Sequence, residues 1–547
     1  MKILKNRLSK AGIVMLTIFS MSCGSDFLDI NTDPNNPSEA SLNLLLPAAQ
    51  LSAGFWTTRN VQENASAFIQ HYTRLNQSTY NITGANFSND FNSMFDQALK
   101  DLQTIVKQGE EAGFKGYSGI AKVMKAYLYM VLVDTWGDVP YTEALQGEDV
   151  LFPHYEDDAA VYDHIIDLVD VAKADLKEAI ENSESPVSSD LIYGGNYSKW
   201  VKAANTLKLR LLLNIRLVDA ARSKSGIETL ITENNFISSN ADDFQFTFGS
   251  SVSPMNQHPI YQQEYIPGSK TQYMNNYFMY NLIAKNDPRL PFYIFRQGED
   301  DDLDFQTQPC SQRSDCVYGW LGGQEPSNGL PALGAAADGY IGRDHGDPSG
   351  IPGDNTIRAT FGVYPIGGSY DVGPGGGERR FDRGHGTGAG IMPWLTNFHV
   401  SFMLAEAAIT LGTPGDPLAL TLKGIEDSFS KVEAFGLAID PNNAIAMDQA
   451  DVDDYLDDIS DRYTAAGNNS QRLNIVMTEK FYASYGNGFE SYTDYRRTGM
   501  PNDQPSALAP SGPFPLRLPY PPGELSSNPN APNPVPLVSE PIFWDAN

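Results

Sequence analysis

Long stretches of helical periodicity, interrupted by one long stretch without it, constrain the fold of this chain more than any other feature. Apolar residues recur three and four positions apart from Ile120 to Leu132, and Gly137 supplies a stop signal. An amphipathic pattern covers Tyr162 to Ile180. The run from Trp200 to Val218 carries leucines on several faces, which indicates a helix packed on more than one side. The sequence therefore predicts a helical region before about residue 235.

The segment from about Phe236 to Pro393 has few periodic runs and many glycines and prolines, as in YIGRDHGDPSGIPGDN at 340–355. An unstructured insert of this length would be unusual in a compact domain, so we expect a packed, loop-rich subdomain with short strands. Helical patterns then return in four segments, namely 394–412, 422–436, 452–463 and 472–486. The C-terminal tail is rich in proline and is expected to be extended.

Helix pairs on both sides of an insertion predict a mainly α fold, in which tetratricopeptide-like helix hairpins carry a loop-rich inserted subdomain containing short strands. No consensus with the tetratricopeptide period of about 34 residues recurs along the chain. A generic helical domain is therefore the alternative to stacked hairpins on the pattern alone.

The first residues have the layout of a secretory signal. Four basic residues within the first ten precede the apolar run Ala11–Phe19, and small residues precede Cys23. The run is too short to span a bilayer, which takes roughly 20 apolar residues. A signal that ends on cysteine resembles the bacterial lipoprotein signal, in which fatty chains such as palmitate are attached to that sulfur. We expect a signal peptide at 1–22 and an acylated Cys23; the alternative is a free or disulfide-bonded cysteine near an ordinary cleavage site.

The charge of the chain restricts its partners. The formal net charge is −29, and a nucleic-acid backbone needs a basic surface, so nucleic acid is not expected as a ligand. This acidity suits solubility, or a neutral or cationic ligand. Cys310 and Cys316 lie close enough to close a small loop, and an exported protein meets oxidising conditions, so we expect them to form a disulfide.

No motif in the sequence identifies a catalytic, metal or cofactor site. GPGGGERR at 373–380 lacks the Gly-Lys-Ser/Thr ending of a phosphate loop, and there is no HExxH. The acidic runs at 299–304 and 448–458 lack the order of an EF-hand loop, so we interpret both as solvated surface, with calcium as the alternative. A glycoside hydrolase needs only two carboxylates, and among 67 acidic residues nothing singles out a pair. We therefore expect no catalytic residues, no metal and no cofactor.

Several stretches, met in the expected order, resemble the SusD/RagB family of outer-membrane nutrient-binding lipoproteins. The GRDHGDPSGIPGDN segment at 342–355 is similar to the branch described as starch-binding and outer-membrane-associating. The stretches that carry the resemblance are CGSDFLDINTDPNNP behind the signal, AKVMKAYLYMVLVDTWGDVPYTEAL at 121–145, WVKAANTLKLRLLLNIR at 200–216, NDPRLPFYIF at 286–295, FMLAEAAI at 402–409, TEKFYASYGNGFESYTDYRRTGMP at 478–501 and RLPYPPGELSSNPN at 517–530.

The resemblance implies a domain organisation and a function. Family members sit as lids over a SusC-like TonB-dependent outer-membrane transporter, capture an oligosaccharide or in some members a peptide, and perform no chemistry themselves. The implied organisation is a leash at 23–40 and a single SusD-like domain at 41–547, with a helical scaffold at about 41–235 and 394–500, a loop-rich ligand-side region at about 236–393 and an extended tail at about 501–547.

Aromatic side chains in the loop-rich region are the candidate ligand-binding residues, because sugars stack on aromatic rings and accept hydrogen bonds from polar side chains. The glycine-rich loop YGWLGGQEPSNG places Trp320 shortly after the two cysteines. The alternative for each aromatic residue is packing in the core of the subdomain. The candidates are Trp320, Tyr340, Tyr273, Tyr277 and Tyr280.

Two further motifs are interpreted as structural. The adjacent arginines of DYRRTG at 494–499 are expected to bind buried carboxylates such as Glu479 or Glu490. Trp136, at the end of an apolar helix, is expected in the core. Two functions compete with nutrient capture: a helical-repeat scaffold that binds only protein partners, and a glycoside hydrolase.

Overall fold

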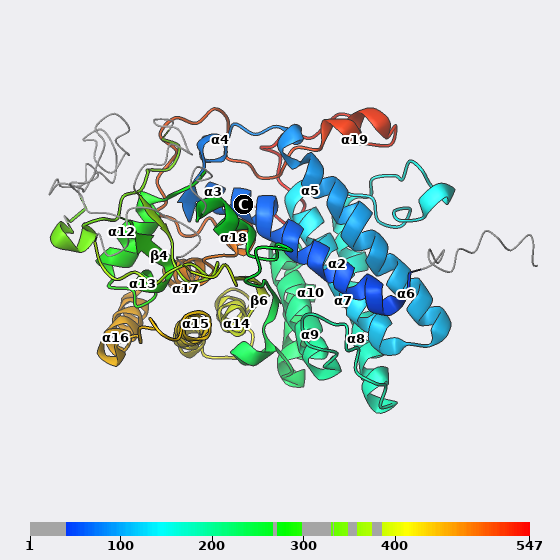
Figure 1. Cartoon of the computed structure of the whole chain (residues 1–547), viewed down its shortest axis with the longest axis horizontal. Helices are drawn as coiled ribbons and strands as arrows, with labels where there is room; N and C mark the ends of the chain where they lie inside the picture. Colours follow the sequence, from blue (N-terminus) through cyan, green and yellow to red (C-terminus); the bar gives the residue numbers. More distant parts are fainter. Residues whose placement is uncertain are drawn as a thin grey trace, which may run out of the picture.

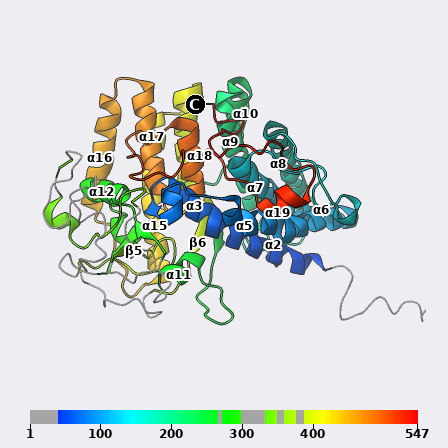
Figure 2. The same cartoon turned by 90° about the horizontal axis from the view of Figure 1, so that it is seen from above.

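The structure is a computed structural model that describes residues 40–265, 271–297, 330–331, 333–347, 358–374 and 386–546. The fold is mainly helical, as predicted. Figure 1 shows two groups of helices, α6 to α10 on the right and α14 to α17 at the lower left, with α2 running across the body. Seen from above, α16, α17, α10 and α9 lie along one side, and α2, α3 and α11 lie on the other (Figure 2).

The first group consists of helices that pack in sequence order. Helix α6 packs on α7, α7 on α8, α8 on α9 and α9 on α10, and α2 crosses α6 and α7. The predicted helices at 120–132, 162–180 and 200–218 are therefore found, with one further helix after them. The bounds are α2 (Leu42–Trp56), η3 (Thr57–Val61), α3 (Gln62–Phe68), α4 (Leu75–Ser78), η4 (Gly84–Phe87), α5 (Ser88–Ser93), η5 (Met94–Leu99), α6 (Lys100–Ala112), α7 (Lys115–Trp136), η6 (Gly147–Asp149), α8 (Asp158–Glu181), α9 (Tyr197–Asn214), η7 (Ile215–Leu217), α10 (Ala220–Glu233) and η8 (Asn240–Asp242).

Each helix of the second group begins at a residue whose side chain caps its N-terminus. Thr396, Asp416, Asp448, Asn468 and Asn487 each accept a backbone N–H bond at the start of a helix, and such side chains are the preferred N-caps. The four helical patterns predicted after residue 393 are confirmed, and a fifth helix follows them. The bounds are α14 (Asn397–Leu411), α15 (Pro417–Ile439), α16 (Gln449–Ala465), α17 (Asn469–Ala483) and α18 (Gly488–Thr498).

The intervening region contains short strands, as predicted, and together with β1 they form three antiparallel pairs. Strand β1 pairs with β3, β2 with β6 and β4 with β5, and Phe246 lies opposite Met392 in the second pair. Because β1 belongs to the first helical region, the β1–β3 pair joins that region to the loop-rich segment. The bounds are β1 (Tyr72–Thr73), β2 (Phe244–Thr247), α11 (Pro259–Glu264), β3 (Tyr273–Met274), α12 (Asn276–Ala284), α13 (Leu290–Tyr293), β4 (Ile294–Arg296), η12 (Gly334–Ala337), β5 (Ala359–Phe361) and β6 (Ile391–Leu395).

The C-terminal tail returns to the end of helix α7. Trp544 donates a hydrogen bond to Asp134 at 2.8 Å, and the Leu518 N–H donates to the carbonyl of Thr135 at 2.6 Å. Trp136 and Trp544 are both fully buried, so the prediction that Trp136 belongs to the core is confirmed. The tail is largely irregular and includes the short helix α19 (Pro522–Ser527), which lies beside α5 in Figure 1.

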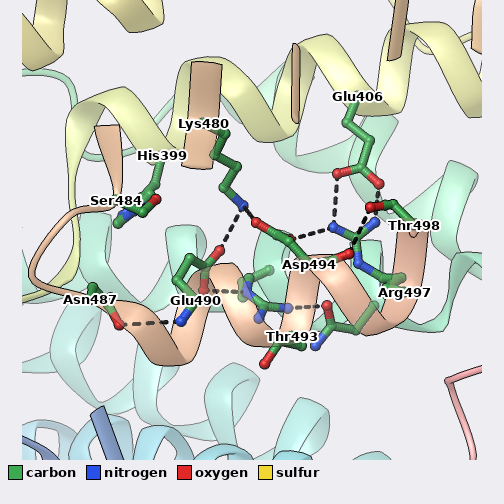
Figure 3. Close-up of polar contacts among 12 residues, drawn as sticks. His399, Glu406, Lys480, Ser484, Asn487, Glu490, Thr493, Asp494, Arg497 and Thr498 are labelled. Atoms are coloured by element: carbon green, nitrogen blue, oxygen red, sulfur yellow. Dashed lines mark hydrogen bonds and ion pairs between the residues drawn. The ribbon is translucent and has the colours of Figure 1, made fainter. Parts of the chain in front are cut away.

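A buried network of ion pairs connects α9, α14, α17 and α18 (Figure 3). Glu490 accepts bonds from Arg210 and Lys480, each at 2.7 Å. Lys480 also contacts Asp494 at 2.7 Å, and Asp494 contacts Arg497 at 2.6 Å. Every charge in this chain of contacts is therefore paired, which is the condition for burying charges at tolerable cost.

The partners of Arg496 and Arg497 differ from those expected from the sequence. Arg497 binds Glu406, which also accepts a bond from Arg216 at 2.8 Å, rather than Glu479 or Glu490. Arg496 donates instead to the backbone carbonyls of Leu516 and Asp134. The structural role expected for the two arginines is confirmed, but their partners were wrong, because they depend on which helices meet in space.

Replacing Arg497 with methionine tests how much the network contributes to the stability of the fold. The change removes one buried cation and leaves the carboxylates of Glu406 and Asp494 with one fewer partner each, so we expect the free energy of unfolding to fall by about 3–5 kcal/mol. Chemical denaturation of the purified protein measures this loss. The control is Arg222→Met, which breaks an exposed pair with Asp163 and should change stability by less than about 1 kcal/mol. Equal effects of the two variants would contradict the prediction.

Candidate functional site

A cleft of about 460 Å³ lies between helix α2 and the loop-rich region, and it is the candidate functional site. Its volume is within the range of about 300–1,000 Å³ typical of small-ligand sites. The lining residues are Leu51, Phe55, Arg59, Leu191, Phe246, Thr247, Phe248, Gly249, Met255, Asn256, Gln257, Pro259, Gln262 and Gln263.

One wall of the cleft is a stripe along α2 and η3. Leu51, Phe55 and Arg59 are spaced four residues apart, so they share one face of the helix. Trp56 and Asn60, each one position later, donate hydrogen bonds to Gln97 at 3.0 Å and Asp90 at 2.8 Å. These bonds hold the adjacent face against α5 and η5, and they leave the stripe turned toward the cleft.

The helix changes its geometry where this stripe ends. Residues 57–61 form a π-helical turn, and the backbone of Arg59 leaves the helical region with φ −76° and ψ −106°. Single π-turns inside α-helices occur frequently at functional sites. The buried Trp394 side chain fixes the turn from the side of β6, because its Nε1 donates to Thr57 Oγ1 at 2.8 Å.

The opposite wall is formed by strand β2 and the residue after it. Phe246 and Phe248 lie on the same side of the strand, with ring centroids 5.0 Å apart in an edge-to-face arrangement. The ring of Phe246 lies directly on the backbone of Gly54, where a Cβ atom would be 2.4 Å from the ring. The absence of a side chain at Gly54 therefore allows the strand to approach α2 and sets the width of the cleft.

The rim of the cleft exposes apolar side chains. Met255 is 64% exposed, and Leu51 and Leu191 are each 52% exposed. The 249–256 loop that carries Met255 is closed by hydrogen bonds from Gly249 N to Asn256 O at 2.9 Å and from Ser251 N to Asn256 Oδ1 at 2.8 Å. Exposed apolar groups gathered around one cavity mark an interaction site.

The polar side chains of the lining supply four amides, one guanidinium and the hydroxyl of Thr247. The amides belong to Asn256, Gln257, Gln262 and Gln263, and each amide both donates and accepts hydrogen bonds. None of the described residues that line the cleft is an aspartate or glutamate. The described wall of the cleft therefore lacks a pair of carboxylates for glycoside hydrolysis.

Behind the cleft lies a set of buried acidic side chains. Burial raises the pKa of Glu264 to about 7, although the Thr271 N–H donates to its carboxylate at 3.1 Å. Burial also raises the pKa of Asp90 to about 7. Glu63 is fully buried and forms an ion pair with Arg74 at 2.6 Å.

The four tyrosines predicted to bind ligand are all less than 5% exposed. The guanidinium carbons of Arg343 and Arg358 lie 4.3 and 3.7 Å from the centroid of the Tyr273 ring, and Arg296 lies 4.4 Å from that of Tyr340. The hydroxyls of the other two donate hydrogen bonds, from Tyr277 to Asp503 at 2.6 Å and from Tyr280 to the carbonyl of Pro331 at 2.9 Å. The structure places all four outside the lining of the cleft, and ligand contact by them stays a prediction.

The remaining predicted site residues, Cys23, Cys310, Cys316 and Trp320, lie outside the described residues, as does the acidic run at 299–304. The run at 448–458 is on α16, and Asp453, Asp454 and Asp457 are exposed, as expected for solvated surface. His345 is buried against the Tyr80 hydroxyl at 2.8 Å.

The described residues contain neither a metal cluster nor a membrane-spanning helix. No cluster of histidine, cysteine, aspartate and glutamate there is arranged to hold a metal ion. None of the helices within the described ranges has the length and apolar character needed to cross a membrane.

The residues of the cleft were not predicted from the sequence. A signal for them exists in FWTTR at 55–59, where aromatic residues precede an arginine, and in FQFTF at 244–248, where phenylalanines alternate. These two segments lie far apart in the chain, so their meeting depends on the tertiary fold.

A second hollow, of about 580 Å³, lies between α5, α19 and the segment 140–153. Phe91, Phe95 and Phe152 line it together with charged residues of both signs. None of its lining residues belongs to the loop-rich region at 236–393, so this hollow serves as a reference site.

Solved structures with the same fold include three SusD-like proteins. A SusD homologue from Bacteroides fragilis has a TM-score of 0.66 at 19% identity, covering 93% of this chain and 99% of that one. A SusD/RagB family protein from Bacteroides thetaiotaomicron has a TM-score of 0.64 at 19% identity, covering 93% and 100%. A chitin-binding SusD homologue from Flavobacterium johnsoniae has a TM-score of 0.64 at 18% identity, covering 92% and 99%. These similarities establish the fold.

Family models identify the class of protein. One described as "Starch-binding associating with outer membrane" matches residues 34–312, just over half of the chain, and one described as "Susd and RagB outer membrane lipoprotein" matches residues 386–536. The chain belongs to the SusD/RagB family of outer-membrane lipoproteins, so the expected family, fold and outer-membrane location are confirmed. No curated protein sequence matches the chain.

The raised pKa of Glu264 makes stability depend on pH. The folded protein keeps this proton to about pH 7, whereas an unfolded glutamate releases it near 4.5, so ionisation of Glu264 destabilises the fold as the pH rises between these values. Glu264→Gln stays neutral at every pH. We expect the free energy of unfolding of this variant, relative to that of the natural protein, to rise by about 2–3 kcal/mol from about pH 5 to about pH 8. Denaturation at both pH values measures this difference, and a constant difference would contradict the prediction.

Gly54→Ala tests the close approach of Phe246 to α2. Alanine favours a helix by up to about 1 kcal/mol over glycine, but its Cβ would collide with the buried ring of Phe246, and overpacking costs about 1–3 kcal/mol. We therefore expect a net loss of stability and a displaced cleft wall. Thermal unfolding measures the loss, and Gly523→Ala, where a Cβ has open space, is the control. A gain in stability from Gly54→Ala would show that the ring moves without cost.

Proposed function

We propose that this lipoprotein captures an oligosaccharide in the cleft between α2 and the loop-rich region and delivers it to a SusC-like TonB-dependent transporter in the outer membrane. Membership of the SusD/RagB family supports the class of function. The observation that carries the assignment to this cleft is its lining, which combines aromatic rings and amides without a carboxylate among the described residues.

The chemistry of the lining fits a sugar. The C–H face of a pyranose ring is apolar and packs against aromatic and aliphatic side chains, here the half-buried Phe55 and the exposed Met255 and Leu51. Sugar hydroxyls both donate and accept hydrogen bonds, as do the amides of Gln262 and Gln263. Loops fixed on a rigid scaffold are a common location for such sites.

The anchor and the partner complete the proposal. Acyl chains on Cys23 would hold the body at the membrane, since each buried methylene contributes about 0.8 kcal/mol. The curved helical scaffold offers a lateral surface for the transporter. In this scheme the lipoprotein only binds, and the transporter moves the ligand. The chitin-binding protein from Flavobacterium johnsoniae, which has the same fold, supports a glycan as the class of ligand.

Phe55→Ala tests the site. The variant removes an aromatic surface from the wall of the cleft, and we expect the dissociation constant for a bound oligosaccharide to rise about tenfold. Calorimetric titration with a panel of oligosaccharides provides the measurement. The control is Phe152→Ala, which removes a half-exposed ring from the second hollow and should leave the affinity unchanged.

The outcomes separate the proposal from its competitors. Co-purification with a TonB-dependent transporter, without binding of any sugar or peptide, would favour a scaffold that binds only protein. Conversion of an oligosaccharide by the pure protein would favour a glycoside hydrolase. A ligand whose affinity responds to Phe152→Ala and not to Phe55→Ala would move the site to the second hollow.

A further inference from the structure

Arg59 is a cation without an acidic partner in the wall of the cleft. Within the described ranges it forms no ion pair, and its buried Nε donates no hydrogen bond. Among the buried arginines, Arg210 binds Glu490 at 2.7 Å and Arg289 binds Asp287 at 2.6 Å, whereas Arg496 donates to backbone carbonyls. Arg59 differs from both cases, because it is half-buried in the wall of a cleft and has neither a carboxylate nor a carbonyl of the described residues bonded to its guanidinium.

Two buried carboxyl groups, those of Glu63 and Asp90, feel the charge of Arg59, and each has one oxygen bonded to another side chain. Glu63 lies within its influence but accepts a bond from Arg74 at 2.6 Å. Asp90 also senses the charge of Arg59, but its carboxylate accepts a bond from Asn60 at 2.8 Å, and burial raises its pKa to about 7. The charge of Arg59 thus acts on both carboxyl groups through space, but its guanidinium forms no direct ion pair with either of them.

The backbone and a neighbouring ring keep Arg59 at the cleft. The backbone of Arg59 departs from helical geometry within the π-helical turn 57–61. The turn is held on either side of Arg59, because Asn60 is bonded to Asp90 and Trp56 is bonded to Gln97. The guanidinium carbon lies 5.5 Å from the centroid of the Phe55 ring. A guanidinium presents a planar fork that matches a carboxylate through two parallel hydrogen bonds.

We propose that the cleft selects oligosaccharides that carry a carboxylate, such as those built from uronic acids, and that Arg59 binds the carboxylate while Phe55 packs against the sugar ring. The inference rests on the proposed function and specifies its class of substrate. The amides of Asn256, Gln262 and Gln263 serve the hydroxyls, which a sugar has in larger number than a peptide terminus does.

The acidity of the whole protein is compatible with an acidic ligand. The net charge of −29 repels an anion at long range, but charges separated by more than about 8 Å are largely screened at physiological ionic strength. Within the cleft, the short-range contact with Arg59 dominates. The same field disfavours anions at other positions of the surface, so binding of a uronic acid should depend strongly on this one residue.

The test uses the full mature lipoprotein in detergent and an array of oligosaccharides in matched pairs, each uronic-acid oligomer beside its carboxyl-reduced neutral counterpart. We expect the acid of a recognised pair to bind at least about tenfold more tightly than its reduced form. The preference should decline as salt is added, because the contact is partly solvated.

Substitutions at Arg59 assign the preference to this residue. Arg59→Gln should weaken binding of the acidic form by about tenfold to a hundredfold and leave the reduced form nearly unchanged. Arg59→Lys keeps the charge but loses the fork, so its effect should be intermediate. Arg462→Gln is the control, because it removes the same charge from an exposed position on α16 outside the cleft, and it should change neither affinity. Thermal unfolding of each variant verifies that it is folded.

Each result has a definite meaning. Acid-selective binding that Arg59→Gln abolishes supports the inference. Equal binding of both members of every recognised pair, or equal loss of both in Arg59→Gln, overturns the inference and leaves the proposed function standing. No binding of any acidic or neutral sugar overturns both. Binding of a peptide with a free terminal carboxylate through Arg59, with no sugar bound, also overturns it, because the class of ligand would then be a peptide.

Discussion

The buried ion network that joins α9, α14, α17 and α18 is the constraint on which the rest of the structure depends. Arg210 comes from the first helical group and Glu490 from the second, so their pairing joins parts of the chain that are 280 positions apart. Removing such charges from water is costly, and the cost is offset only when the helices are placed so that every charge meets its partner. Other packings of these helices would leave buried charges without partners, so the network destabilises them relative to the native packing. The network thereby fixes the helical frame that carries the loop-rich region.

The cleft is a product of that frame. Its two walls belong to elements that the sequence separates widely, α2 and β2, and they meet because Gly54 has no side chain to hold the ring of Phe246 away. Buried Gln50 holds α2 against the segment that carries Leu191 of the rim, since it donates to Asp190 at 2.7 Å and accepts from the N–H of Leu191 at 2.8 Å. Walls that are held in place before binding lower the entropy lost when a ligand binds.

Much of the fold could be predicted from the sequence, and little of the site. Apolar spacing located α7, α8 and α9 and the helices after residue 393, because the core imposes a period on every helix that it contacts. Glycine and proline marked the loop-rich region. The sequence did not predict that Arg497 pairs with Glu406, because the residues around an arginine do not indicate which of many acidic side chains it meets in the fold. The cleft escaped for a related reason: aromatic residues in loops attracted interest, whereas Phe55 and Arg59 are on a helix whose role becomes visible only beside β2.

The return of the tail to helix α7 has a consequence for biogenesis. Trp544 and Asp134 are separated by 410 positions, so the end of helix α7 is covered only when the tail has docked on it. Until that contact forms during folding, the carboxylate of Asp134 lacks one of its hydrogen-bond donors and the apolar end of the helix faces water. Docking of the tail is therefore a late step that closes the core of the first helical group.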